Sequence, residues 1–268
     1  MANAAKWWRR FAKLRRLRRI ADSVVVHDRL LKRPIPRALL LQALCGHARG
    51  RFPQPADLTL VVAHDYPGES LMEQSVRYVT GAPCAVARIE PADRWRFTQK
   101  VTALRDFLAS APRTEYLLFA DANDCVLRDD PRRAAALLAE YDCDLLFSSS
   151  DSIEQYAYMP EIKQWVDDTF PAPSRGGRYL NSGCFVGRWG FVAEVVEAAC
   201  EFIYEPGDPA APRPIAWKRR GEIRATERHP WGVELDQDFY RYLQPRFHPR
   251  LRVDPDWKLA LRSGEAPL

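Results

Sequence analysis

Short apolar runs alternate with amphipathic segments through the middle of the chain, between about residues 55 and 190. The apolar runs have the length of buried strands and cover residues 58–63, 84–89, 115–120 and 144–149. Segments with apolar residues three or four positions apart predict helices at about residues 69–79, 98–110, 131–141 and 191–203. This alternation predicts an α/β domain whose mostly parallel, Rossmann-like sheet is covered by helices, with an antiparallel strand near residues 178–187.

The two ends of the chain have different patterns. The N-terminal segment up to about residue 50 is interpreted as helical, with proline breaks, because apolar residues recur at helical spacing: Trp7, Phe11, Leu14, Leu17 and Ala21. Residues 204–268 are rich in proline, arginine and tryptophan, with one predicted helix at 234–243 and an irregular tail. We therefore expect a basic helical extension at 1–50 and one domain at 51–268, of which 205–268 is a variable region.

The charge of the chain is concentrated at its N-terminus. The formal net charge is +5, and much of the excess lies within residues 6–20. This basic arm could contact an anionic membrane surface or pack on the domain; nucleic acid is not expected, because the rest of the chain has no RNA-binding motif. No apolar run approaches the roughly 20 residues that span a bilayer, and no secretory signal is evident. The six cysteines form no CxxC pair, so we expect reduced residues and a cytoplasmic protein.

The most informative polar cluster follows the strongest predicted strand. The run EYLLFA leads directly into Asp121, and Asp124 follows three positions later, before the chain becomes apolar again. Open α/β sheets bind ligands beyond the carboxyl ends of their strands. Two carboxylates on one tight loop can hold a hard divalent cation, which can neutralise a departing diphosphate. In the structural alternative, Asp121 caps the next helix and Asp124 faces solvent.

Three further positions carry candidate chemistry. Asn181, Ser182 and Gly183 interrupt a predicted strand, where small polar residues allow close approach of a ligand or simply form a bulge. Asp236 opens the predicted helix 234–243; it can position or deprotonate a hydroxyl group, or favour the helix dipole. His64 ends the first predicted strand, where a nucleotide base or ribose can rest, although HDYPG is equally explained as a plain turn.

These motifs together resemble one enzyme family. In order and spacing, LLFADANDCVL, LLFSSS, RYLNSGCFVG and LDQDFY are similar to segments of the glycosyltransferase domain of the multifunctional lysyl hydroxylases and related procollagen glycosyltransferases. RWRFTQKV and LTLVVAHDY extend the resemblance, which spans about residues 58–242. It implies a GT-A fold, a uridine-diphosphate (UDP) sugar as donor, and Mn²⁺ or Mg²⁺. The use of alanine, arginine and proline is typical of a GC-rich bacterial source.

The resemblance implies roles for particular residues. Asp121 and Asp124 would be the paired metal ligands, because both occupy the family's aspartates. Trp95 is similar to a tryptophan packed near the nucleotide, and Lys100 lies in the matching QKV segment. Asp236 matches an acid implicated in acceptor binding or catalysis, which makes residues 205–268 the acceptor side.

The turn formed by Asn181, Ser182 and Gly183 lies in the segment most characteristic of the family and would help to place the donor. Other positions depart from the family: Asn123 stands where the family has an aromatic residue beside the nucleotide. The family's third metal ligand is a histidine in a C-terminal HGNG-type segment, which this chain lacks; His248 is the candidate substitute. The hydroxylase domain is absent too, so collagen lysine is not expected as substrate.

The predicted function is transfer of a sugar, most simply a hexose, from a UDP-linked donor to a hydroxyl of a glycan, lipid or peptide. Two other functions are compatible with the sequence. A nucleotidyltransferase of similar topology also uses aspartates and a divalent ion, although AHDYPGES is a poor phosphate-binding loop. A degenerate transferase fold could act as a membrane- or partner-binding module instead.

Overall fold

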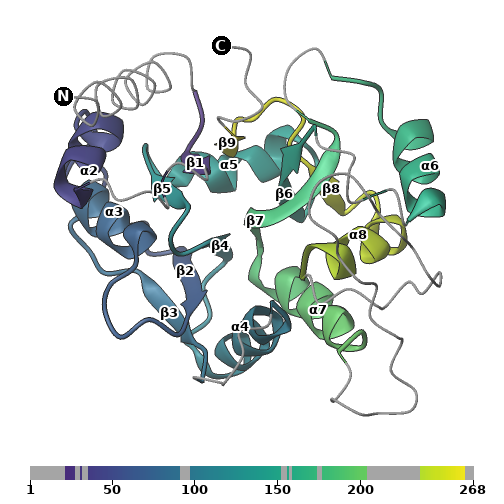
Figure 1. The fold of residues 1–268 in the computed structure, drawn as a ribbon, viewed down its shortest axis with the longest axis horizontal. Coiled ribbons are helices and arrows are strands. Elements are labelled where there is room, and N and C mark those ends of the chain that lie inside the picture. The colour runs from purple at the N-terminus through teal and green to yellow at the C-terminus, as the bar shows by residue number, and fades with distance from the viewer. Residues whose placement is uncertain are drawn as a thin grey trace, which may run out of the picture.

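The computed structural model describes residues 22–27, 31, 36–90, 97–151, 156, 159–173, 177–203 and 236–262. Figure 1 shows helices packed around a twisted central sheet. In chain order, the elements are β1 (Val25–His27), α2 (Arg37–Cys45), β2 (Leu58–His64), α3 (Leu71–Thr80), β3 (Ala85–Arg88), α4 (Thr98–Ser110), β4 (Tyr116–Ala120), β5 (Cys125–Leu127), α5 (Arg132–Glu140), β6 (Leu145–Ser150), α6 (Pro160–Thr169), β7 (Tyr179–Arg188), α7 (Trp189–Cys200), α8 (Asp236–Phe247), β8 (Leu251–Val253) and β9 (Ala260–Arg262).

The main sheet has six strands in the order β3-β2-β4-β7-β6-β8. All neighbours pair in parallel except β7, which runs antiparallel to both β4 and β6. A second sheet of three short strands has the order β5-β1-β9. The predicted α/β class is therefore confirmed, together with its mostly parallel sheet, and so is the antiparallel strand near residues 178–187. The architecture is consistent with a GT-A-like fold.

Alternate residues of the central strands face two separate apolar layers, as the two-residue period of a strand requires. In β4, Leu118 packs in the cluster formed with α2, α3 and α5, whereas Leu117 and Phe119 pack in the cluster formed with α4, α7 and α8. Both faces of the sheet are thus covered by helices. This explains why β4 is a continuous apolar run in the sequence.

Two described segments near the ends of the chain differ from the sequence-based expectation. Val25–His27 forms a strand inside the segment expected to be helical, because three consecutive β-branched residues (Val24, Val25, Val26) favour a pleated, buried backbone. The C-terminal tail, expected to be irregular, contributes β8 to the main sheet and β9 to the second sheet. The basic arm at residues 1–21 lies outside the described residues, and the division of the chain into domains stays a prediction.

Candidate active site

The carboxyl end of β4 places two aspartates at the edge of the sheet. Residues 122–124 form a turn between β4 and β5. The Asp121 N–H donates to the Gly183 carbonyl at 2.8 Å, which ties this turn to the antiparallel strand β7. The Asp121 side chain is 24% exposed and that of Asp124 is 9% exposed. Both acids therefore lie at the strand end where the sequence predicted them.

A buried lysine connects this turn to helix α8 in the C-terminal part of the chain. Lys100, in the first turn of α4, places its Nζ 2.7 Å from Asp121 Oδ1 and 2.9 Å from Asp236 Oδ2. Asp236 begins α8 and also accepts a hydrogen bond from Ser182 Oγ at 3.0 Å. The predicted site residues Lys100, Asp121, Ser182 and Asp236 thus meet, although they come from four different elements.

The electrostatics of this cluster leave it short of positive charge. Burial raises the pKa of the Asp121 carboxyl above its usual value, and the negative charges of Asp124 and Asp236 add to the effect against the opposing charge of Lys100. Burial works against the Lys100 ammonium, but the two carboxylates raise its pKa above the usual range, so the lysine stays charged. Three carboxylates face one ammonium, and such a cluster favours an additional cation.

His27, which the sequence analysis did not identify, lies beside the aspartates. Its Nε2 is 3.6 Å from Asp124 Oδ2 and 4.0 Å from Asp121 Oδ2. Strand β1 carries it there by pairing antiparallel with β5, with His27 opposite Cys125. A signal for this residue exists in the sequence: SVVVHD is an apolar run ending in His-Asp, as is LTLVVAHD, whose histidine ends β2.

The segment Asn181–Gly183 forms part of β7 at this site. The Asn181 side chain donates to Gln237 Oε1 at 2.7 Å and accepts from Ser148 Oγ at 3.2 Å, where the register between β6 and β7 shifts. A Cβ on Gly183 would lie 2.2 Å from His27 Cε1 and 3.0 Å from Asp121 Oδ2. Only glycine therefore fits between the histidine and the aspartate.

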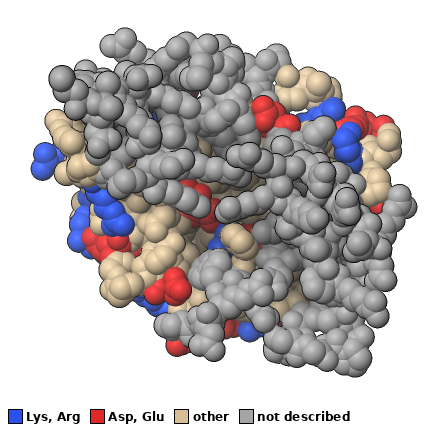
Figure 2. Space-filling model, viewed as in Figure 1, with Lys and Arg blue, Asp and Glu red and all other residues tan. Residues whose placement is uncertain are grey.

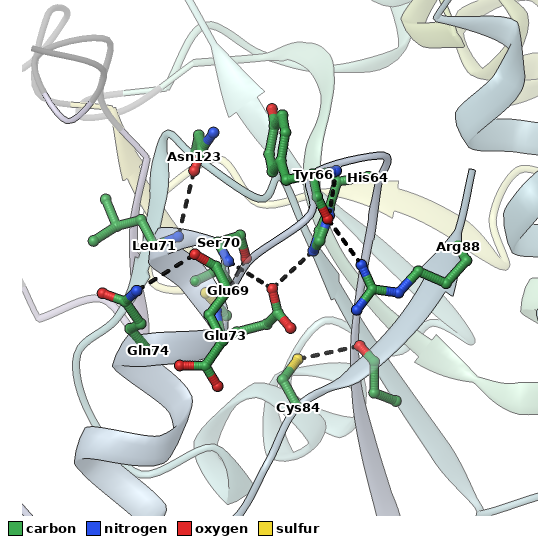
Figure 3. Close-up of polar contacts among 12 residues, drawn as sticks. His64, Tyr66, Glu69, Ser70, Leu71, Glu73, Gln74, Cys84, Arg88 and Asn123 are labelled. Atoms are coloured by element: carbon green, nitrogen blue, oxygen red, sulfur yellow. Dashed lines mark hydrogen bonds and ion pairs between the residues drawn. The ribbon is translucent and has the colours of Figure 1, made fainter. Parts of the chain in front are cut away.

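His64 is buried at the end of β2, the strand that pairs in parallel with β4, and Figure 3 shows it beside Tyr66 and Glu73. The Tyr66 N–H donates to His64 Nδ1 at 3.1 Å, so Nε2 carries the proton and donates to Glu73 Oε2 at 2.7 Å. Glu73 and Ser70 form the capping box of α3. Tyr66 stacks on His64 with ring centroids 4.8 Å apart and is 38% exposed. His64 thus uses both ring nitrogens internally and supports an exposed aromatic ring.

Of the remaining predicted residues, Asn123 lies in the same turn as Asp124, whereas His248 follows the end of α8. Asn123 Oδ1 accepts from the Leu71 N–H at 3.4 Å, at the first residue of α3 (Figure 3). The His248 ring packs edge-on against Trp165 and Phe170, each at 5.6 Å between centroids, so its contacts are with aromatic rings. Trp95 lies outside the described residues.

The residues present fit a divalent cation. Ligand atoms of His27, Asp124 and Cys125 lie within 4.8 Å of one another, and Asp121 adds a second carboxylate beside them. The Cys125 thiol already donates to the Gly183 carbonyl at 3.4 Å, and burial raises its pKa well above the usual value. The remaining donors are carboxylate oxygen and imidazole nitrogen, which are common ligands of divalent cations.

The described surface shows no separation of charge on the face drawn in Figure 2, where basic and acidic side chains lie next to one another. Within the ranges that the structure covers, none of the helices combines the length and the apolar character that crossing a bilayer requires. The six cysteines are all free. These features leave the charged cluster at the sheet edge as the chemically distinctive part of the described molecule.

Comparisons with known proteins do not assign this chain to a family. No protein-family model matches this chain, and no curated protein matches it. Among solved structures, the chain is similar to mouse xyloside xylosyltransferase 1 in its apo form, with 11% sequence identity over 85% of this chain and 82% of that chain and a TM-score of 0.35. A likeness this distant carries no information about activity, which has to be argued from the site.

Proposed function

We propose that this protein is a metal-assisted glycosyltransferase, which moves a sugar from a nucleoside diphosphate sugar, a UDP-linked one in the first instance, to a hydroxyl acceptor. The observation that carries the proposal is the pair of ion pairs that Lys100 forms with Asp121 and Asp236 at the carboxyl edge of the sheet. Ligands of open α/β sheets bind at this edge. The order of the motifs along the chain supports the same function.

In this proposal, Asp121 and Asp124 hold Mn²⁺ or Mg²⁺. When bound, the cation supplies positive charge that stabilises the diphosphate leaving group. Lys100 holds the carboxylates of Asp121 and Asp236 at fixed positions, 2.7 Å and 2.9 Å from its own nitrogen. Because these positions are set before substrate binds, little reorganisation accompanies the reaction. Asp236 would then orient or deprotonate the acceptor hydroxyl from the α8 side.

The donor would lie between the turn after β2 and strand β7. The exposed Tyr66 ring, supported by His64, offers a face on which a nucleobase can stack. Gly183 leaves room for close approach beside Asp121. Asn181, Ser182 and Asn123 are proposed to shape this part of the pocket through the hydrogen bonds that they make within the chain. Trp95 is proposed as a further donor contact.

The proposal is tested by measuring donor binding and donor turnover together. We expect one or more UDP-sugars to raise the melting temperature in the presence of Mn²⁺, because a ligand that binds only the folded state stabilises it. The same donor should release UDP slowly by transfer to water, a readout that needs no known acceptor. Stabilisation by nucleoside triphosphates alone would favour a nucleotidyltransferase, and stabilisation by neither class would favour a binding module.

Asp124→Asn should abolish the Mn²⁺-dependent shift in melting temperature and leave the metal-free melting temperature within about 2 °C, because the change is nearly isosteric. The matched control is Asp106→Asn, since the Asp106 side chain is 68% exposed and forms a surface ion pair with Arg105. The control should retain the full shift. An Asp124→Asn protein with an unchanged Mn²⁺ response would contradict the metal assignment.

A further inference from the structure

Strand β1 is held in place from both sides. It pairs antiparallel with β5 and parallel with β9, and the N–H groups of Val24 and Val25 donate to the carbonyls of Lys258 and Leu259 at 3.0 Å and 2.9 Å. Strand β5 begins directly after Asp124. The pairing of β1 with β5 therefore sets the position of His27 relative to the aspartate turn.

The distances from His27 to the two aspartates are those of groups that share a cation. At 3.6 Å and 4.0 Å, its Nε2 lies beyond hydrogen-bond length from Asp124 Oδ2 and Asp121 Oδ2. Two atoms that each lie about 2.1 Å from the same ion are separated by roughly 3 to 4 Å. The histidine and the acids thus have the spacing of ligands without a direct bond among them.

Internal contacts do not account for this histidine. Its side chain is 7% exposed, and its Nδ1 has no hydrogen-bond partner among the described residues. A metal bound at Nε2 would not supply a partner for Nδ1, so this observation shows only that no hydrogen bond at Nδ1 explains the orientation of the ring. The absence of a side chain at Gly183 leaves the space that the ring occupies, since a Cβ there would lie 2.2 Å from His27 Cε1.

Cys125 is the alternative third donor, because its sulfur lies within 4.8 Å of ligand atoms of His27 and Asp124. Its Sγ, however, already donates a hydrogen bond to the Gly183 carbonyl. His248 is the alternative predicted from the sequence, but its ring is packed against Trp165 and Phe170. His27 is therefore the described histidine whose ring nitrogen faces both acids.

We propose that His27 is the third protein ligand of the divalent cation held by Asp121 and Asp124, so that the N-terminal strand β1 completes the metal site. This inference rests on the proposed metal-assisted function. It replaces a ligand from the C-terminal part of the chain with one from a strand that precedes the whole α/β domain. The site is then built from β1, the β4–β5 turn and the space left by Gly183 in β7.

The test uses the full chain, Mn²⁺ alone and a readout other than activity. Electron spin-echo envelope modulation of bound Mn²⁺ detects a nitrogen atom in direct coordination, and labelling the protein with ¹⁵N-histidine identifies that nitrogen as imidazole. We expect this signal in the wild type. In His27→Gln it should disappear, and the affinity for Mn²⁺ should fall at least about tenfold. Gly183→Ala should reduce both while leaving His27 in the sequence.

Two kinds of variant keep the result decisive if His27→Gln folds poorly. Gln substitutions at each of the other four histidines, His47, His64, His229 and His248, should retain the nitrogen signal, which leaves the assignment to His27 without need of its variant. Cys125→Ser should retain both the signal and the affinity. Loss of the signal in His248→Gln, loss of affinity in Cys125→Ser, or a wild-type spectrum without imidazole nitrogen would each overturn the inference.

Failure of this inference is distinguishable from failure of the transferase proposal. A wild-type protein that turns over a UDP-sugar with Mn²⁺ bound but no coordinated imidazole overturns the role of His27 and leaves the transferase proposal standing. A protein that coordinates Mn²⁺ through His27 but neither binds nor turns over any nucleotide sugar supports the role of His27 and contradicts the transferase proposal.

Discussion

Removal of the Lys100 charge tests the electrostatic arrangement on which the candidate site depends. Lys100→Met keeps a side chain of similar length and removes the ammonium that lies 2.7 Å from Asp121 and 2.9 Å from Asp236. The side chains of Lys100 and Asp236 are only 9% and 7% exposed, so water cannot replace the lost charge at Asp236. Two carboxylates would then be left at the sheet edge without their shared cation.

The expected loss of stability follows from the burial of the three groups. Removal of one partner of a buried ion pair costs about 3 to 5 kcal/mol. Asp121 is 24% exposed and can be solvated in part, so the lower end, about 3 kcal/mol, is expected here. For a domain of this size that corresponds to a fall of about 6 to 12 °C in melting temperature. Asp236→Asn added to Lys100→Met should restore about 1 kcal/mol, because one unpaired charge is removed.

Urea unfolding of the metal-free protein, followed by circular dichroism, measures the loss of stability in Lys100→Met and its partial recovery in the double variant. EDTA in the buffer prevents a divalent ion from substituting for the lysine. Lys163→Met is the matched control, because Lys163 forms a solvent-accessible ion pair with Asp167 one helical turn away, and such pairs contribute little to stability. A loss below about 1 kcal/mol in Lys100→Met, or strict additivity with Asp236→Asn, would refute the reasoning.

Two further predictions concern the residues around the site. Burial raises the pKa of the Glu73 carboxyl, but hydrogen bonds from Ser70 and His64 outweigh this effect and lower the pKa below the ordinary 4.5. The stability that Glu73 contributes is therefore present above about pH 4.5 and is lost as the pH falls through the lower pKa of the folded state. Urea unfolding from pH 3 to pH 7 should show a stability difference between wild type and Glu73→Gln that is constant near neutrality and shrinks in acid, and a difference that grows in acid would contradict the sign. Gly187→Ala should cost about 1 to 3 kcal/mol, because its Cβ would lie 2.6 Å from Val192 Cγ2 and 2.9 Å from Leu145 Cδ1, whereas Gly68→Ala, which meets nothing within 4 Å, should be close to neutral in the same assay.

Much of the α/β framework could be predicted because its signals are local. The strand β4 is a continuous apolar run, and its neighbours α4 and α7 show apolar spacing that matches one helical face, so the predicted and observed bounds agree closely. The strands β5, β8 and β9 have three residues each, too few for a two-residue period to be recognised. They exist because their partners in the sheets satisfy their backbone hydrogen bonds, which is a tertiary effect.

In the candidate site too, residues marked by a local sequence pattern could be predicted, whereas contacts that depend on tertiary packing could not. Asp121 and Asp124 were predictable because a buried strand ends directly before them. The contact of Lys100 with both Asp121 and Asp236 depends on how α4 and α8 pack, and only the family resemblance pointed to that lysine. The Asn181–Gly183 segment was recognisable as an interrupted strand, but its partners, among them Ser148 and Gln237, were not.

His27 shows most clearly why the rest of the site could not be predicted from local patterns. Its place beside Asp124 follows from the register in which Val25, Val26 and His27 pair with Leu127, Val126 and Cys125. Side chains alternate between the two faces of a strand, so a shift of this register by one residue would turn the imidazole away from the aspartates. That register is set by backbone hydrogen bonds to β5 and β9, segments that are distant in the chain from β1 and from each other. The position of His27 is therefore specified by the pairing of three short strands. The sequence indicates a role for this histidine in the site only once that pairing is known.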